Sequence, residues 1–149
     1  MVNIRVDGLD AFRAGLDGLI ARIDAATRVA TGIGGHVIEA NAKRQFEGNH
    51  PRGQPHIGGN KPNVVTGTLH RSITLVPPMP EPLGLGIWRV SVAPTTKYGR
   101  RIELGFRGAD SLGRRFNQPP YPFMQPGLEQ AIPVLSTVFS DAWARALSA

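Results

Sequence analysis

The sequence contains no cysteine, which excludes a disulfide framework, a thiolate metal site and a cysteine nucleophile. It also lacks long apolar runs. Its longest ones, such as residues 132–135, are far shorter than the roughly 18 residues that indicate a membrane span. The first residues alternate apolar and polar side chains and lack the basic start and apolar stretch of a signal peptide. We therefore expect neither a membrane span nor an export signal.

The length fits one domain over residues 1–149. A domain of this size buries roughly 68 to 70% of the surface that its unfolded chain exposes, so a sizeable core is expected without disulfides or metals.

Positive charge gathers in the middle of the chain. The net charge is +6, and residues 40–115 carry twelve Lys and Arg against four acidic residues, a net charge of +8. Fourteen of the seventeen basic residues are arginine. Arginine side chains match phosphate geometry, and clustered cations release counterions from DNA. The pattern is therefore compatible with a polyanionic partner.

Apolar spacing predicts two helices. Residues 9–47 have apolar side chains on one helical face, interrupted at residues 31–35 (TGIGG). These glycines lack the preceding strand and following Lys-Ser/Thr of a phosphate loop, so we interpret them as a bend or a close crossing in one long, kinked helix. A second helix is expected from Pro126 to the carboxy terminus, because proline suits a first helical turn; Pro133 should distort it.

Between these helices the sequence predicts a small, mainly antiparallel sheet. Residues 72–76 and 86–92 have strand character, and the proline-rich segment between them predicts a stiff, extended connection rather than a tight turn. Residues 2–6 predict a further short strand, and residues 98–106 a helical turn or a strand. Extended loops are expected at residues 48–65 and, after that, at 107–118. The predicted fold class is α+β.

Catalytic chemistry is not expected. His50, His56 and His70, with Asn60, have the residue types of a small His-Asn-His nuclease, but no paired histidine spacing or second acid cluster accompanies them. Glu103 has no partner carboxylate or histidine placed by sequence, so we interpret it as an ion-pairing or backbone-ordering acid. No metal or cofactor site is predicted.

Candidate DNA contacts are five arginines in or beside the second loop: Arg100, Arg101, Arg107, Arg114 and Arg115. A solvated loop surface explains such a charge run equally well. No recognition-helix pattern or aromatic interleaving indicates base reading, so any DNA contact is expected through the phosphate backbone.

Three short pieces follow one another in a fixed order. Residues 66–73 are TGTLHRSI, residues 98–105 are YGRRIELG, and residues 120–126 are PYPFMQP. Together they resemble the neck or tail-component proteins of long-tailed bacteriophages, the gene-ten family of HK-ninety-seven-like phages. The resemblance covers about residues 9 to 145.

The resemblance implies a non-enzymatic α+β protein of the virion, assembled in the host cytoplasm. It would form a homo-oligomeric ring, expected to be hexameric, around the DNA channel between head and tail, and would contact other neck, portal-side and tail proteins. A ring built from heterologous contacts needs two different patches on each subunit, and long loops can become ordered against the next copy. Phe106 and Arg107 replace the Gly-Thr that is usual in the family, which leaves the position within the neck open.

Three aromatic residues and the two long loops are candidate subunit contacts: Trp88, Phe106 and Tyr121. Large aromatic side chains carry much of the binding energy of interfaces when they are buried there. Ordinary packing within the chain is the alternative for each of them. A basic nucleic-acid-binding module without catalysis is the alternative function.

Overall fold

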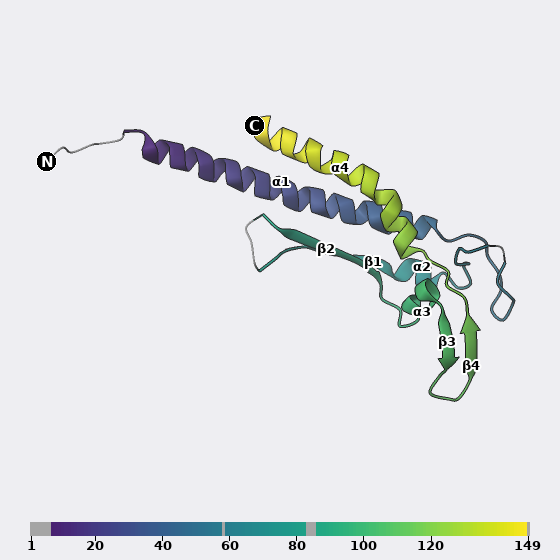
Figure 1. Ribbon diagram of the computed structural model, residues 1–149. Coiled ribbons are helices and arrows are strands. Elements are labelled where there is room, and N and C mark those ends of the chain that lie inside the picture. The colour runs from purple at the N-terminus through teal and green to yellow at the C-terminus, as the bar shows by residue number, and fades with distance from the viewer. Residues whose placement is uncertain (1–6, 58, 83–85, 149) are drawn as a thin grey trace.

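The computed structural model describes residues 7–57, 59–82 and 86–148 (Figure 1). The arrangement is α+β, as predicted: a long N-terminal helix and a C-terminal helix accompany two small antiparallel hairpins. The strand predicted at residues 2–6 lies outside the described residues. The elements are α1 (Leu9–Arg44), α2 (Thr68–Ser72), β1 (Ile73–Pro80), β2 (Trp88–Pro94), α3 (Gly99–Leu104), β3 (Phe106–Ala109), β4 (Arg115–Gln118) and α4 (Met124–Ser148).

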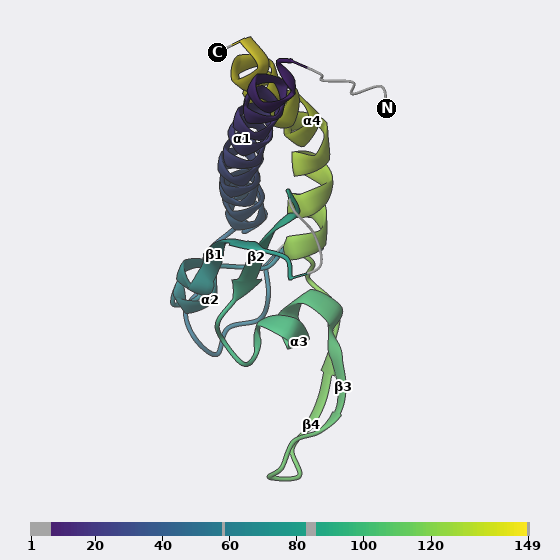
Figure 2. The same cartoon turned by 90° about the vertical axis from the view of Figure 1, so that its left-hand side faces the viewer.

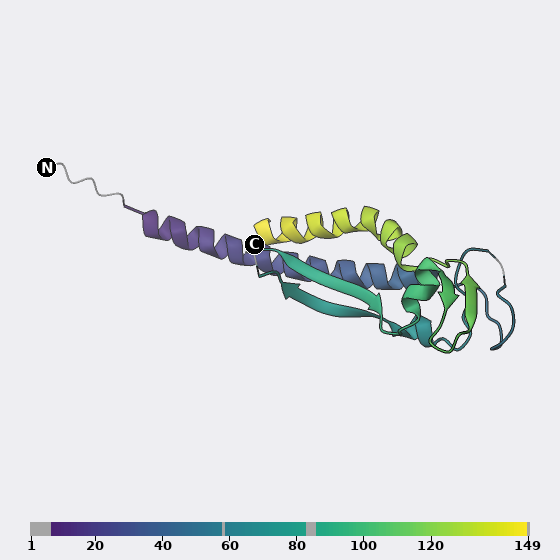
Figure 3. The same cartoon turned by 60° about the horizontal axis from the view of Figure 1, so that its bottom comes forward.

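Helix α1 passes through the glycine cluster without a break, and Figures 1 and 3 show no sharp kink there. The glycines instead permit close packing on two sides. A Cβ on Gly34 would lie 2.8 Å from Cδ2 of Leu135 in α4, and one on Gly35 would lie 2.7 Å from Cγ2 of Val90 in β2. The interpretation as a close crossing is therefore confirmed, and the expected kink is not seen.

Helix α4 packs along α1 and carries Pro126 in its first turn, as predicted. The helix continues through Pro133, and Figure 3 shows it curved over α1. Its first turn approaches α1 backbone to backbone, since a Cβ on Gly127 would lie 2.6 Å from the backbone nitrogen of Ala42. Further along, Trp143 Nε1 donates a hydrogen bond of 3.0 Å to Oγ1 of Thr27.

The β1–β2 hairpin corrects one boundary of the sequence prediction. Strand β1 does not end at Val76 but continues to Pro80, with a register shift between Val76 and Met79. Proline cannot donate to a ladder, so it is confined to edge strands and irregularities. Both strands of a two-stranded sheet are edges, which is why this strand tolerates the prolines.

The β3–β4 hairpin corrects a second prediction, because residues 107–118 were expected to form a loop. Phe106 pairs with Gln118 and Ala109 pairs with Arg115. The side chain of Asp110 orders the connecting turn: Oδ1 accepts hydrogen bonds from the backbone N–H groups of Leu112 (3.0 Å) and Arg114 (2.9 Å). Such four-residue, largely exposed strands leave no alternating apolar pattern in the sequence.

The three pieces that carry the family resemblance meet in one small core. Leu69 and Ile73 from the first piece pack with Phe123 from the third and Ala42 of α1, and Ile102 from the second piece packs against this cluster. Phe123 and Ile73 are fully buried. Segments far apart in the sequence are thus joined at the C-terminal end of α1.

Outside this core the chain is open. The β3–β4 hairpin projects from the body (Figure 2), and the N-terminal part of α1 extends beyond both α4 and the β1–β2 hairpin (Figures 1 and 3). Among the described residues, no helix has the combination of length and apolar character that a membrane crossing requires.

Candidate interaction site at the hairpin end

The β3–β4 hairpin has two different faces. Side chains alternate between the faces of a strand, and residues paired across the ladder share a face. Arg107, which is opposite Asn117, therefore shares one face with Arg115, and Phe106 and Phe116 share the other. The two phenylalanine rings are 6.0 Å apart between centroids. The hairpin thus combines a basic face with an aromatic one.

The five predicted arginines divide into two groups. The guanidinium of Arg101 lies over the ring of Phe106, 4.3 Å from its centroid. Arg114 Nε donates a hydrogen bond of 2.6 Å to Oδ2 of Asp110. Arg100, Arg107 and Arg115 are exposed and form no ion pair within the described part of the chain. These three remain available to an external anion.

Asp110 organises this end of the molecule electrostatically. The hydrogen bond from the Arg114 side chain is the main cause that holds the pKa of Asp110 below its ordinary value, and partial desolvation opposes it. Backbone hydrogen bonds from Arg114 and Leu112 lower the pKa further. The carboxylate is therefore ionised at neutral pH and neutralises one of the two arginines at the tip. Sequence reasoning did not identify this residue, although an acidic residue before a Leu-Gly turn is a typical turn signal.

The three aromatic interface candidates lie in different places. Trp88, in β2, donates a 2.9 Å hydrogen bond from Nε1 to Oδ1 of Asp24, and is half-buried against α1. Phe106 is half-buried beneath Arg101. Tyr121 stacks on His56 with 4.0 Å between ring centroids. Each therefore has a partner within its own chain, and the structure does not bring the three together.

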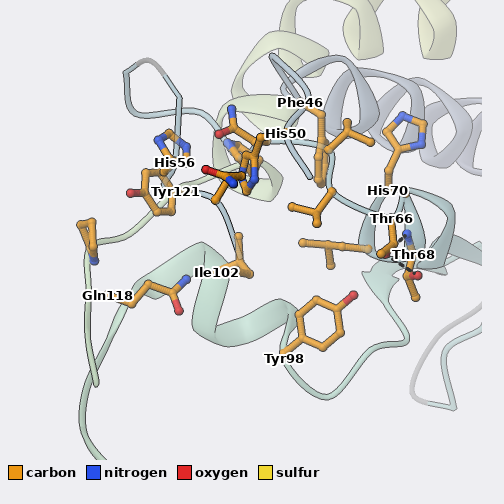
Figure 4. A pocket seen from close by; sticks show the side chains of 18 of the residues that line it. Phe46, His50, His56, Thr66, Thr68, His70, Tyr98, Ile102, Gln118 and Tyr121 are labelled. Carbon is orange, nitrogen blue, oxygen red and sulfur yellow. Dashed lines mark hydrogen bonds between the residues drawn. The ribbon is translucent and has the colours of Figure 1, made fainter. Parts of the chain in front are cut away.

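A cavity of about 550 Å³ lies between the long loop after α1 and the hairpin end (Figure 4). Its wall combines aromatic rings with uncharged polar groups. Figure 4 shows Tyr98, which precedes α3, and Ile102 of α3 facing Phe46, Thr66 and Thr68 across it. The long loop is thus partly ordered against its own chain, where Asn49 and Val64 also form an isolated parallel bridge.

The histidines of the nuclease hypothesis all line this cavity, but their rings have structural partners. His50 Nδ1 is 2.9 Å from the carbonyl oxygen of Pro51, and His56 Nε2 is 2.9 Å from that of Lys61. His70 packs edge-on to Phe46. Within the described residues, no group of three or more His, Asp or Glu side chains is placed to hold a metal ion. The exposed Asn60 does not line the cavity.

Glu103 has the backbone-ordering role that the sequence suggested. Its Oε2 accepts hydrogen bonds from the backbone N–H groups of Phe123 (2.7 Å) and Met124 (2.9 Å), and its Oε1 accepts one of 3.0 Å from Gln125. These groups begin α4, where the N–H groups lack intrahelical partners and the helix dipole favours negative charge. Glu103 of α3 therefore caps the N-terminus of α4 and links the two helices by hydrogen bonds.

Comparison with known families, curated proteins and solved structures finds no match for the chain. The family resemblance therefore stays a prediction. At the hairpin end, a projecting basic face and an aromatic face lie beside a cavity lined by aromatic and polar side chains.

Proposed function

We propose that this chain is a structural virion protein of a long-tailed bacteriophage. It forms part of the head-to-tail connector, as a neck or tail-completion ring around the DNA channel. It acts by contact with further copies and with head-side and tail-side proteins, and it performs no chemistry. It is made in the host cytoplasm and resides at the head-tail interface of the virion.

The observation that carries this proposal is the exposed surface of the isolated chain. The chain exposes 10774 Å², whereas a compact monomer of 16.0 kDa exposes about 7,400 Å². Standard interfaces bury about 800 Å² on each partner, so a ring subunit with two neighbours covers about 1,600 Å². The excess surface is large enough for two neighbours and a further protein above or below the ring.

The convergence of the three sequence pieces supports the same proposal. They come from separate parts of the chain, yet Glu103, Leu69 and Phe123 join them in one fastened core. Their fixed order then reflects one structural unit rather than three unrelated turns. The projecting hairpin gives such a ring a basic element that can line its channel.

The decisive experiment is electron microscopy of lysates from a phage in which this gene is disabled. We expect filled heads and tails that fail to join, or tails of abnormal length, because a missing connector leaves head filling and tube assembly otherwise intact. Supplying the wild-type gene from a plasmid should restore joined particles. Normal infectious particles without the gene would contradict the proposal.

The contact with DNA has a test of its own. Replacing Arg107 and Arg115 with Ser should weaken the retention of packaged DNA, most clearly at low salt, because each lost phosphate contact reduces counterion release and makes retention less dependent on salt. Arg114 is the matched control: its Ser variant should act mainly on the turn, since Asp110 already neutralises it. Equal DNA loss from both variants would contradict a phosphate contact by the basic face.

The basic face also supports the second candidate, a nucleic-acid-binding module. That function predicts tight, salt-dependent binding of free duplex DNA by a monomer or dimer. Fluorescence anisotropy with a labelled duplex distinguishes the two: a connector subunit should bind free DNA weakly, because its phosphate contacts become dense only when they are repeated around a ring.

A further inference from the structure

The free end of α1 carries an apolar stripe formed by Leu9, Phe12, Leu16 and Ile20. These side chains are exposed by 42%, 64%, 41% and 54%. Their spacing places them on one side of the helix. Four exposed apolar side chains in a continuous row are unusual for the surface of a monomer, where such residues are normally scattered.

The stripe continues the surface on which α4 packs. Further along α1, the same side of the helix contains Thr27, which bonds Trp143, and Gly34, which packs against Leu135. Helical periodicity places all of these positions within one face. Figures 1 and 3 show that α4 ends before it reaches the stripe. The stripe is therefore the part of an established helix-packing surface that this chain cannot cover itself.

A second apolar feature is a groove of about 610 Å³ between α1 and α4. Val29 and Ile33 in its wall are exposed by 59% and 46%. Half of the other side chains are alanines, which let a third helix approach closely. Its lining residues are Arg22, Ala25, Ala26, Val29 and Ile33 of α1, and Val138, Asp141, Ala142, Arg145 and Ala146 of α4.

The stripe and the groove match in length. The stripe extends from Leu9 to Ile20 and the α1 wall of the groove from Arg22 to Ile33, which is twelve residues in each case. Twelve helical residues span about 17 Å. An amphipathic helix in a groove uses anchors at this i, i+3, i+7 type of spacing.

Their charges are also complementary. The stripe is flanked by two acidic residues and one basic residue, and the groove by two basic residues and one acidic residue. None of the six forms an ion pair within the described part of the chain. They are Asp10, Arg13 and Asp17 beside the stripe, and Arg22, Asp141 and Arg145 at the groove.

We propose that the apolar stripe of one copy docks in the α1–α4 groove of a second copy. Stripe and groove are different patches, so the contact is heterologous, and each copy keeps one free stripe or groove for the next. Such contacts form a closed ring when the rotation that relates one subunit to the next divides a full turn evenly. The inference deepens the proposed function, because it supplies the subunit contact of the proposed ring.

The test uses the purified full chain and light scattering after size exclusion. Wild type should be oligomeric, whereas the stripe variant Phe12→Glu with Leu16→Glu and the groove variant Val29→Glu should each be monomeric. The substituted side chains are largely exposed in the monomer, so circular dichroism should remain unchanged. The matched control is Leu112→Glu at the hairpin tip, which is 75% exposed and should remain oligomeric.

Mixing the two monomeric variants gives the sharper result. The intact groove of the stripe variant can accept the intact stripe of the groove variant, so a heterodimer should form and go no further. Packing of stripe against stripe predicts no complex in the mixture. Three results would overturn the docking proposal: a groove variant that is still oligomeric, a mixture without heterodimer, or a wild type that is monomeric at about 100 µM. That concentration lies well above a micromolar dissociation constant.

Hydrogen exchange provides a second readout at residue level. Amides around Phe12 should exchange quickly in the monomeric variants, because an isolated helix end without tertiary packing frays. They should be protected in the wild-type oligomer. If these tests fail but disabling the gene still prevents heads and tails from joining, only this subunit contact is rejected. If phage particles form normally without the gene, the proposed function itself is rejected.

Discussion

The two ends of α1 differ in how their apolar side chains are covered. At the C-terminal end, Ala42 packs against Gly127 of α4 and joins the core with Phe123 and Ile73. At the N-terminal end, Phe12 and Leu16 belong to the same amphipathic pattern but are exposed and lie outside the core cluster of the described residues. Amphipathicity therefore identifies a surface that needs a partner, and it does not say whether the partner belongs to the same chain.

Glycine substitutions should give the largest difference between the two ends of α1 in their effect on the free energy of unfolding. Gly127→Ala should destabilise the fold by about 3 kcal/mol, because its Cβ would meet the backbone of Ala42, which cannot rotate away. At the free end, a Cβ on Gly18 would have no neighbour within 4 Å, so Gly18→Ala should stabilise α1 by up to about 1 kcal/mol. Urea unfolding followed by circular dichroism measures both.

If both substitutions change the free energy of unfolding by similar amounts, the contrast between a packed end and an open end of α1 is wrong. A Gly127→Ala protein that does not fold is distinguished from a merely destabilised one by its loss of the native far-ultraviolet signal before urea is added.

A smaller loss of stability is expected when the Glu103 cap at the N-terminus of α4 is removed. Glu103→Ala removes the acceptor of three backbone N–H groups, which should cost about 2 kcal/mol. Glu103→Gln keeps one acceptor oxygen but loses the charge that favours a helix N-terminus, so its cost should be intermediate. Glu129→Ala is the matched control, since the Glu129 carboxylate accepts a hydrogen bond from the exposed side chain of Gln125 rather than from backbone N–H groups of the described residues. Equal stability of the Glu103 and Glu129 variants would contradict the capping role.

Parts of this fold were predictable because their signals are local. Pro126 marks the first turn of α4, and Glu103 was interpreted as an ion-pairing or backbone-ordering acid, of which the structure shows the second role. The structure adds its partners, which lie twenty or more positions away and leave no spacing rule in a single sequence.

Other parts depended on tertiary context. The strand through Pro80 exists because both strands of its sheet are edges, and that fact is a property of the assembled sheet. The β3–β4 hairpin rests on Asp110 and four short ladder pairs rather than on apolar alternation. The exposure of the stripe could have been expected from the sequence. The predicted C-terminal helix is shorter than the predicted N-terminal one, so it cannot cover the whole apolar face of the longer helix.

The smallest expected effect concerns the hairpin tip and follows from the lowered pKa of Asp110. A carboxyl whose pKa is lowered in the folded state adds stability that is fully present above its ordinary pKa and is lost as pH falls through the lowered value. The hairpin should therefore be insensitive to pH near neutrality and loosen in acid, while the core held by Phe123 stays intact. Amide exchange of Leu112 and Arg114, followed by NMR from about pH 6 to about pH 2, measures this local opening.

Asp110→Asn separates the charge from the turn. The amide oxygen can still accept from the backbone N–H groups of Leu112 and Arg114, but the ion pair with the Arg114 side chain is lost. The acid-dependent step should therefore disappear, and protection near neutral pH should fall to about the level that the wild type has in acid. A hairpin whose acid transition persists in this variant would owe its order to other carboxylates. The turn at the tip therefore depends on the charge and hydrogen bonds of Asp110, whereas the strands beside it also have the contact between the rings of Phe106 and Phe116.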